Sequence, residues 1–348
     1  MELKNKKILI TCPISAGIDG VWTRVKQDAK MYKEMGNEVL VISSNRTKGS
    51  NEIAPSLSEE DGVIIKRFDF KKLGGETFMK WDKSWKDLAY DFCPDLIITH
   101  VYRHIHTTES LKIARELHIP IFLVTHAPFV EGDVSRSFLS KWIVRIYDKT
   151  YGRQTIKKFD KIIAVANWEK EYLKRLGVDM NKVEVIKNYI PKEFKEIPIG
   201  SYGPRDVLFL GRISPIKDIE TIIRVAERMP NIKFTIVGSS EPEYAKKLHD
   251  WIIDGQIHNI DFYPPVYDVE EKIKLIDEHK FFILPSIREA MPTVLLEAKE
   301  RKRIIVASDN PGNREVIEDY SNGYLFPVGD YETVMKHLKI LMKNGKNN

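Results

Sequence analysis

Short runs of apolar and β-branched residues alternate with amphipathic segments of helix length, and this alternation restricts the possible folds more than any other feature of the chain. In the first half, such runs occupy residues 7–11, 38–42, 63–65, 95–99, 120–125 and 161–165. Strands that alternate with helices form parallel βαβ units, and the resulting sheet is covered by helices on both faces. We therefore expect a doubly wound α/β domain in this half.

The same pattern begins again in the second half. Runs at 206–210, 233–237, 281–284 and 303–307 are separated by segments whose helices are predicted to begin near Ile216, Pro242, Val269 and Thr293. Between residues 188 and 204 the periodicity stops and prolines and glycines accumulate, which is typical of a linker. We expect a first domain over 1–190 and a second over 191–348. Two doubly wound domains would face a central cleft, with ligands in the loops beyond the carboxyl ends of the strands.

Composition limits the compartment and the partners. The 348 residues include only two cysteines, Cys12 and Cys93, so no disulfide framework is possible and we expect two inert core thiols in a cytoplasmic protein. No run of 18 apolar residues could span a membrane. The first 190 residues carry a net charge of +7 and the remainder −2. This asymmetry is too weak for a nucleic-acid-binding domain and favours an acidic ligand or an anionic lipid surface.

The loop after the first strand run of the second half brings two cations together. Gly211 and Arg212 follow the run at 206–210, and Lys217 comes five residues later, at the predicted start of the next helix. Backbone N–H groups at a helix N-terminus, a guanidinium fork and an ammonium suit a diphosphate. For this loop taken alone, two solvated cations beside a capped helix are the alternative.

A later loop carries two carboxylates eight positions apart. If the next helix begins near Pro292, Glu289 lies in the loop and Glu297 lies about one and a half turns inside the helix. This separation is too long for a pair that shares a proton, and it suits the two ends of an elongated ligand. A solvated glutamate and a capping glutamate would explain the same residues structurally.

Together with a third loop at 309–315, these motifs closely resemble those of the retaining GT-B glycosyltransferases of family 4. The residues that carry the resemblance are Gly211-Arg212, Lys217, Pro285-Ser286, Glu289, Glu297, Gly312, Glu315 and Asn322-Gly323, with 160–168 and 185–188 upstream. The resemblance extends over nearly the whole chain and is most specific in the second half. It implies the GT-B fold, with two Rossmann-like domains.

The resemblance also implies an enzyme that transfers a sugar from a nucleotide-diphospho-sugar to a saccharide or lipid-linked acceptor, with retention of the anomeric configuration. Arg212 and Lys217 would hold the diphosphate and stabilise the charge on the leaving group. Glu297 would accept hydrogen bonds from the nucleotide ribose, and Glu289 would contact hydroxyl groups of the donor sugar. The alternative is a catalytically silent subunit that binds a nucleotide-sugar and supports a partner enzyme.

In the first domain, which the resemblance assigns to the acceptor side, histidines and glycines occupy loop positions. His100 and His126 each follow a predicted parallel strand, where site residues collect. The resemblance implies that His126 touches the donor sugar near its reacting carbon, and a structural histidine is the alternative. Gly17 and Gly20 would let the backbone approach the donor phosphate or the acceptor, or would simply form a tight turn.

Some residues depart from the family pattern. Ala166 stands where relatives often carry serine. Ala290 and Met291 replace the commoner Gly-Phe in the loop whose backbone N–H groups would assist donor binding, and we expect a reshaped sugar pocket. About one helix follows Asp330, so we expect the family's closing helix to be shortened or missing.

No metal and no further cofactor are expected. The sequence has no Asp-x-Asp triplet at a strand end and no group of His, Cys and carboxylates with metal-ligand spacing. The cations of the second half would meet the phosphate charge, and the nucleotide-sugar would be a co-substrate. A GxGxxG fingerprint and a Ser-His-Asp arrangement are also missing, so a dehydrogenase or a hydrolase has little support.

One segment combines cations with apolar residues. Lys141, Arg145, Lys149, Arg153 and Lys157 recur every four residues and form a slowly turning basic stripe along a predicted helix. Aromatic and aliphatic residues lie between them. Such a helix could lie on an anionic bilayer, which would place the protein peripherally at the inner face of the cell membrane. The alternative is a helix that packs on the first sheet and exposes a solvated basic face.

Overall fold

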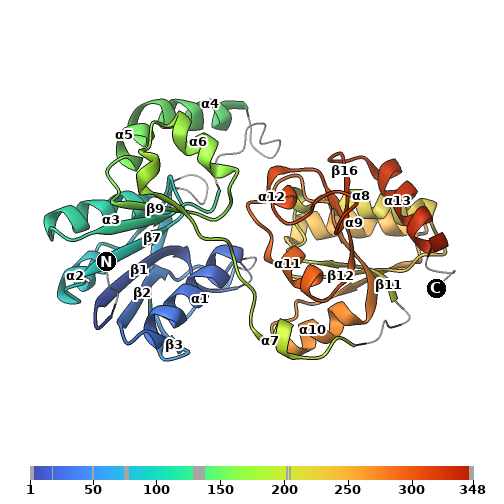
Figure 1. Cartoon of the computed structure of the whole chain (residues 1–348), viewed down its shortest axis with the longest axis horizontal. Helices are drawn as coiled ribbons and strands as arrows, with labels where there is room; N and C mark the ends of the chain where they lie inside the picture. The colour runs from blue at the N-terminus through green and yellow to red at the C-terminus, as the bar shows by residue number, and fades with distance from the viewer. Residues whose placement is uncertain are drawn as a thin grey trace. The chain divides into compact units, whose positions relative to one another are not determined.

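The chain forms two compact units, Met1–Lys187 and Asn188–Asn348 (Figure 1). The computed structural model describes residues 4–17, 19–48, 51–73, 78–127, 138–200, 203 and 205–344. The units divide between residues 187 and 188, whereas the sequence places the boundary between 190 and 191. Each unit is an α/β domain built on a mainly parallel sheet, as predicted.

The sheet of the first unit has the strand order β10-β9-β8-β7-β1-β2-β4-β3. Its strands are β1 (Lys7–Ile14), β2 (Glu38–Ser44), β3 (Leu57–Glu60), β4 (Val63–Phe68), β7 (Leu96–His100), β8 (Ile121–Val124), β9 (Lys161–Ala164) and β10 (Val183–Val185). Neighbouring strands pair in parallel, apart from β3 with β4. A separate antiparallel hairpin joins β5 (Phe70–Lys72) and β6 (Met79–Trp81). The direction of winding reverses between β1 and β7, which is where such sheets bind ligands.

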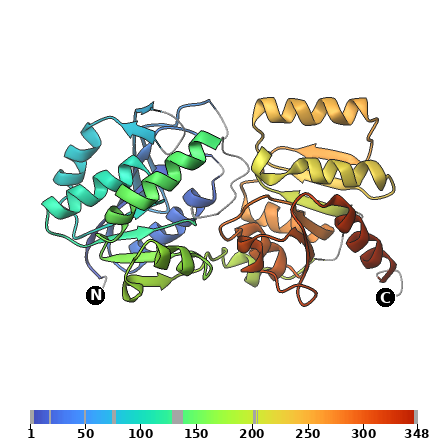
Figure 2. The same cartoon turned by 90° about the horizontal axis from the view of Figure 1, so that it is seen from above.

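Helices cover this sheet. They are α1 (Gly20–Glu34), α2 (Ser84–Asp91), α3 (Ile105–Glu116), α4 (Phe138–Tyr147), α5 (Arg153–Ile156) and α6 (Glu169–Arg175). Because α3 and α5 belong to successive crossovers, β7 to β8 and β8 to β9, they cover the same face of the sheet. Figures 1 and 2 show them side by side. Leu111 of α3 and Ile156 of α5 are buried in one core with Leu123 of β8.

The second unit repeats the architecture with a parallel sheet in the order β13-β12-β11-β14-β15-β16. Its strands are β11 (Arg205–Leu210), β12 (Phe234–Val237), β13 (Ile260–Tyr263), β14 (His279–Leu284), β15 (Ile304–Ser308) and β16 (Tyr324–Phe326). Its helices are α7 (Glu193–Glu196), α8 (Ile219–Arg228), α9 (Pro242–Asp254), α10 (Val269–Asp277), α11 (Thr293–Glu300), α12 (Pro311–Arg314) and α13 (Tyr331–Asn344). The winding reverses between β11 and β14.

Most predicted elements are present, and the differences have local causes. Three predicted helices begin at the expected residues, Pro242, Val269 and Thr293. The helix predicted near Ile216 begins instead at Ile219, because Pro215–Lys217 form a 3₁₀ turn and Asp218 adopts a left-handed φ of 49°. The prediction missed short strands such as β10 and β16, since three residues are too few to show a period of two.

One expectation about the first unit is wrong. Cys12 is a buried core thiol as predicted, but Cys93 is exposed, because it lies in the turn after α2 with a φ of 50°. The helix predicted through 141–157 is present: α4, a π-helical turn over Asp148–Gly152 and α5 follow one another without a break from Phe138 to Ile156. In this turn Gly152 packs so closely on Tyr102 and Tyr147 that a Cβ atom would clash with both. Among the described residues, no helix is both long and apolar enough to cross a bilayer.

Candidate functional site

The winding reversal of the second unit brings Lys217 and Glu289 together. Lys217 lies in the loop after β11 and Glu289 in the loop after β14, and their side chains form an ion pair that is largely shielded from solvent, at 18% and 12% exposure. The backbone N–H of Ile287 donates to the carbonyl of Ile216 at 2.9 Å and ties the two loops to each other. The predicted cation and the predicted sugar-binding carboxylate are therefore direct neighbours.

Arg212 lies in the same loop as Lys217, closer to the strand. Its guanidinium is 3.6 Å from the carboxylate of Glu241, a loosely held and half-exposed pair. The loop is placed by its neighbour after β12: Ile213 N–H donates to the carbonyl of Ser239 at 2.8 Å, and a Cβ atom at Gly238 would clash with the carbonyl of Gly211. Only glycine permits this approach, so Gly238 fixes the backbone that carries Arg212.

The loop at 309–315, after β15, supports the loop after β14 that carries Glu289. A Cβ atom on Gly312 would clash with the backbone of Glu289, so α12 and the Glu289 loop are in direct contact. Asn310 Nδ2 donates to the carbonyl of Ser286 at 3.0 Å, and the hydroxyl of Ser308 donates to the same carbonyl. The motif at 309–315 therefore acts through packing and hydrogen bonds behind Glu289.

Glu297 lies in the second turn of α11 and is 3% exposed. Lys272 of α10 donates to its carboxylate at 2.6 Å. Glu289 and Glu297 therefore each have a cation of their own, in keeping with separate roles. Lys272 was missed by sequence reasoning, since a helical lysine 25 positions away gives no local signal of this contact.

The backbone between the two glutamates is held by the start of the second unit. Met291 is buried, and its carbonyl accepts a hydrogen bond from Asn188 Nδ2 at 2.9 Å. Ala290 is half-buried. Helix α11 begins at Thr293, and Pro292 is its N-cap. Asn188, expected at the end of the first domain, is therefore bonded to the loop between the two glutamates.

In the first unit, His100 and His126 meet at the carboxyl ends of β7 and β8. His100 Nδ1 and His126 Nε2 are 2.9 Å apart, so one ring donates to the other. His100 is fully buried, and its carbonyl accepts a hydrogen bond from His106 Nε2 at 3.0 Å. His126 and the next residue, Ala127, both have left-handed backbones, with φ of 55° and 50°. Such backbones are costly outside glycine and persist only where neighbours impose them.

Burial keeps these imidazoles uncharged. Burial, followed by the charge of Arg24 and the nearby His104, lowers the pKa of His126 to about 3. Burial also holds the pKa values of His100 and His106 well below the usual range. A neutral His126 can exchange hydrogen bonds with a hydroxyl group, and it adds no positive charge for a phosphate.

The residue that imposes the backbone at His126 is Glu169, which sequence reasoning missed. Its carboxylate is fully buried and accepts four hydrogen bonds, from the hydroxyl of Thr125 and the backbone N–H groups of Ala127, Val165 and Ala166. The first two donors flank His126. The available signal was a carboxylate in the first turn of the helix that follows a buried strand. The two partners that flank His126 are 42 and 44 positions away and gave no signal.

The glycines after β1 differ from each other. Gly17 has a φ of 81°, and a Cβ atom there would clash with the backbone of Lys48, so a neighbouring segment already requires this glycine. At Gly20, the first residue of α1, a Cβ atom would meet nothing within 4 Å. Open space beside a helix N-terminus lets a ligand approach the backbone N–H groups. Of the two, only Gly20 leaves room for a ligand.

Among the residues that the structure describes, no three His, Cys, Asp or Glu side chains are grouped as metal ligands would be. Positive charge is supplied in the second unit by Arg212 and Lys217. The arrangement there can bind an anion next to a carboxylate that accepts hydrogen bonds from hydroxyl groups. These are the two requirements of a sugar attached to a diphosphate.

Two family models match the chain, Glycosyltransferase Family 4 over residues 18–194 and Glycosyl transferases group 1 over 192–348. The N,N'-diacetylbacillosaminyl-diphospho-undecaprenol alpha-1,3-N-acetylgalactosaminyltransferase of Campylobacter jejuni is 22% identical, over 94% of this chain and 83% of that protein. The phosphatidyl-myo-inositol mannosyltransferase of Mycolicibacterium smegmatis is 24% identical, over 93% and 81%. The structure of Anabaena HepE with UDP and glucose superposes with a TM-score of 0.74 at 16% identity, over 98% of this chain and 91% of that one.

Proposed function

This chain belongs to Glycosyltransferase Family 4, and on that premise we propose that it transfers a sugar from a nucleotide-diphospho-sugar with retention of the anomeric configuration. The ion pair of Lys217 with Glu289 at the winding reversal carries this proposal. It sets a phosphate-binding cation beside a carboxylate that can accept hydrogen bonds from a sugar. In the related HepE, the bound molecules are UDP and glucose.

Each of the predicted site residues has a role in this proposal. Arg212 and Lys217 hold the diphosphate and stabilise the negative charge that develops on the leaving group. Glu297 accepts hydrogen bonds from the ribose, and Glu289 binds hydroxyl groups of the sugar. The neutral His126 of the first unit is assigned to the sugar that is transferred.

We expect Arg212→Ala and Lys217→Ala each to weaken the binding of nucleoside diphosphates by about tenfold or more. Each change removes a charge-assisted hydrogen bond worth roughly 1.5–3 kcal/mol. Calorimetric titration with UDP, GDP and ADP measures the effect. Lys246→Ala, which removes an exposed lysine from α9, serves as the control and should bind normally. Unchanged affinity in both loop variants would contradict the proposed donor site.

Hydrolysis of the donor separates an enzyme from a silent binding subunit. Slow release of free sugar and nucleoside diphosphate from a bound donor indicates a working transfer centre. Binding without turnover across a broad panel of acceptors would favour the silent subunit.

Metal independence is a further part of the proposal. Because two cationic side chains can offset the phosphate charge, we expect activity to survive dialysis against EDTA. Transfer rates before and after chelation, with and without added Mg²⁺ or Mn²⁺, test this expectation. A loss of activity that either metal restores would show that the cations of the protein do not suffice.

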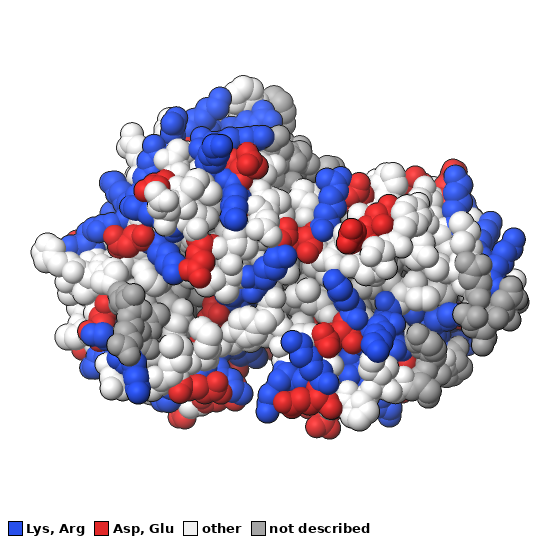
Figure 3. Space-filling view, in the orientation of Figure 1, with Lys and Arg blue, Asp and Glu red and all other residues white. Residues whose placement is uncertain are grey.

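The acceptor is proposed to be lipid-linked, so that the enzyme works at an anionic membrane surface. Helix α4 exposes Trp142, Ile143 and Ile146, each 48% to 57% accessible. Arg145 and Lys149 are exposed beside them, whereas the side chain of Lys141 lies outside the described residues. Figure 3 shows Lys and Arg gathered over the surface of α4 to α6. Exposed apolar side chains flanked by cations favour the membrane alternative over a packed helix.

We expect the protein to sediment with phosphatidylglycerol vesicles at low salt and to be released at high salt. Each basic residue near the surface adds about 1 kcal/mol that salt screens. The variant Arg145→Gln/Lys149→Gln should sediment less, and the charge-matched control Lys336→Gln/Lys339→Gln on α13 should behave as wild type. Failure of the wild type to sediment at low salt would point to a soluble acceptor.

A further inference from the structure

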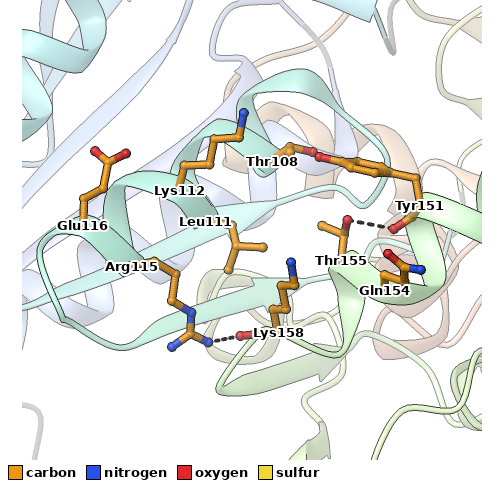
Figure 4. A pocket seen from close by; sticks show the side chains of 9 residues that line it. All are labelled: Thr108, Leu111, Lys112, Arg115, Glu116, Tyr151, Gln154, Thr155 and Lys158. Carbon is orange, nitrogen blue, oxygen red and sulfur yellow. Dashed lines mark hydrogen bonds between the residues drawn. The ribbon is translucent and has the colours of Figure 1, made fainter.

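A groove lined mainly by polar and charged residues lies between α3 and the segment of α5 on the outside of the first unit. Its volume is about 360 Å³. One wall is a single face of α3, and the other is a single face of the segment from the π-helical turn through α5. The lining residues are Thr108, Leu111, Lys112, Arg115, Glu116, Tyr151, Gln154, Thr155 and Lys158 (Figure 4). Neighbouring helices on one face of a sheet usually pack apolar side chains against each other, and here polar and cationic ones face an open space.

The charges in this groove favour an anion. Lys112, Arg115 and Lys158 contribute three cations, against the single carboxylate of Glu116. That carboxylate already accepts a hydrogen bond from the hydroxyl of Tyr90. The groove therefore presents an excess of positive charge.

The cations also differ in how firmly they are held. Arg115 donates to the carbonyl of Lys158 and lies 3.4 Å from Asp160, which fixes its guanidinium at one end of the groove. No ion pair between the ammonium groups of Lys112 or Lys158 and a carboxylate is found within the described part of the chain. A fixed guanidinium with two adaptable ammonium groups suits the several oxygens of a phosphate group.

The groove differs from the proposed transfer site. Its α3 wall runs to Glu116, just before β8 begins at Ile121, and Lys158 lies just before β9. It therefore reaches the amino ends of these strands, whereas His100 and His126 follow the carboxyl ends. Tyr151, which lines the groove, is 49% exposed and lies one turn after the exposed face of α4. Through Tyr151, the groove therefore lies next along the helix to the surface that is proposed to meet the membrane.

We propose that the α3–α5 groove binds the phosphate group of an anionic membrane lipid. Lys112, Arg115 and Lys158 would bind the phosphate oxygens, with Gln154 and Thr108 as further hydrogen-bonding groups. The lipid chains would extend toward Tyr151 and the apolar face of α4. This inference rests on the proposed membrane contact, and it adds a defined head-group site to it.

The test uses dihexanoyl-phosphatidylglycerol below its micelle concentration, so that no bilayer is needed. Calorimetric titration of the full chain should show binding that Lys112→Gln/Lys158→Gln weakens at least tenfold. The control Lys336→Gln/Lys339→Gln should leave binding unchanged. Because all four lysines are exposed, thermal unfolding should show that both variants remain folded. Absence of lipid binding, or equal binding by the groove variant, would overturn the proposal.

Inorganic phosphate and dihexanoyl-phosphatidylcholine identify the source of the phosphate. If both bind more weakly than dihexanoyl-phosphatidylglycerol does, the result supports an anionic lipid as the ligand of the groove. If inorganic phosphate binds as tightly as the lipid and needs the same two lysines, the groove takes a soluble phosphate and the lipid assignment is wrong. Binding of the short-chain lipid without vesicle sedimentation would reject the membrane contact of α4 and keep the head-group site. If the groove variant Lys112→Gln/Lys158→Gln binds the nucleotide-sugar donor as tightly as the wild type does, the head-group site and the membrane contact are both separate from the transfer site.

Discussion

Replacing Glu169 with alanine is expected to lower the free energy of unfolding by roughly 3 kcal/mol or more. The carboxylate is fully buried and accepts four hydrogen bonds from two loops. Without it, four buried donors lose their acceptor, and each unsatisfied group costs about 1–3 kcal/mol. Urea unfolding followed by circular dichroism measures the change. Glu171→Ala, an exposed position on the same helix, should cost little and serves as the control.

Glu169→Gln distinguishes a positioning role from a purely structural one, and it protects the test against a variant that fails to fold. The amide retains one acceptor oxygen, so we expect an intermediate loss of stability. We also expect turnover to fall more than donor binding, because Thr125 and Ala127, which flank His126, are held by the same carboxylate. A stability loss with unchanged turnover would show that Glu169 supports the fold alone.

The pH dependence of unfolding provides a third measure of Glu169. Burial raises the pKa of its carboxyl to about 7, although its hydrogen bonds oppose the shift, whereas the unfolded value is 4.5. The folded state therefore holds the proton more tightly. The resulting stability is present in full below pH 4.5 and is lost as the pH rises through about 7. Relative to Glu169→Gln, the wild type should lose up to roughly 1.4 kcal/mol per pH unit within that window.

Replacing Glu289 with alanine is expected to lower turnover roughly 10- to 100-fold while leaving nucleoside diphosphate binding intact. A hydrogen bond between a charged carboxylate and a sugar hydroxyl is worth about 1.5–3 kcal/mol, and 1.4 kcal/mol corresponds to a factor of ten. Loss of Glu289 also releases Lys217 from its ion pair, and a released ammonium binds phosphate at least as well. Steady-state kinetics and titration with the diphosphate measure the two effects separately.

The matched variant is Glu297→Ala, for which the opposite pattern is expected. This buried carboxylate is paired with Lys272 and is assigned to the ribose, so its loss should weaken nucleotide binding. If Glu289→Ala weakened nucleotide binding and Glu297→Ala affected only turnover, the two roles would have to be exchanged. Glu289→Gln, which keeps the shape and removes the charge, should lie between wild type and alanine in turnover.

The elements of both units were largely predictable because their signals are local. The runs at 206–210 and 281–284 fall within β11 and β14, and α9, α10 and α11 begin at the expected residues. Alternating hydrophobicity and helix start signals act over a few residues, so one sequence suffices to read them. The positions of Arg212, Lys217 and Glu289 in strand-to-helix loops follow from the same pattern.

The contacts among these residues were not predictable in the same way. Lys217 and Glu289 are 72 positions apart, and only the strand order, with β11 beside β14, brings their loops together. Two donors to Glu169, Val165 and Ala166, are close in sequence, but the two that flank His126 follow β8 and lie more than 40 positions away.

By itself, the sequence determined the α/β class, the repetition of the doubly wound unit, and which residues stand at the carboxyl ends of strands. The tertiary structure decided which of those residues meet: Lys217 with Glu289, Glu297 with Lys272, and His100 with His126. It also decided where two lysines, Lys112 and Lys158, lie without an ion pair among the described residues, in the α3–α5 groove. The physical reason is that backbone periodicity is set by neighbours along the chain, whereas ion pairs and burial depend on the lateral order of strands and on the space between helices.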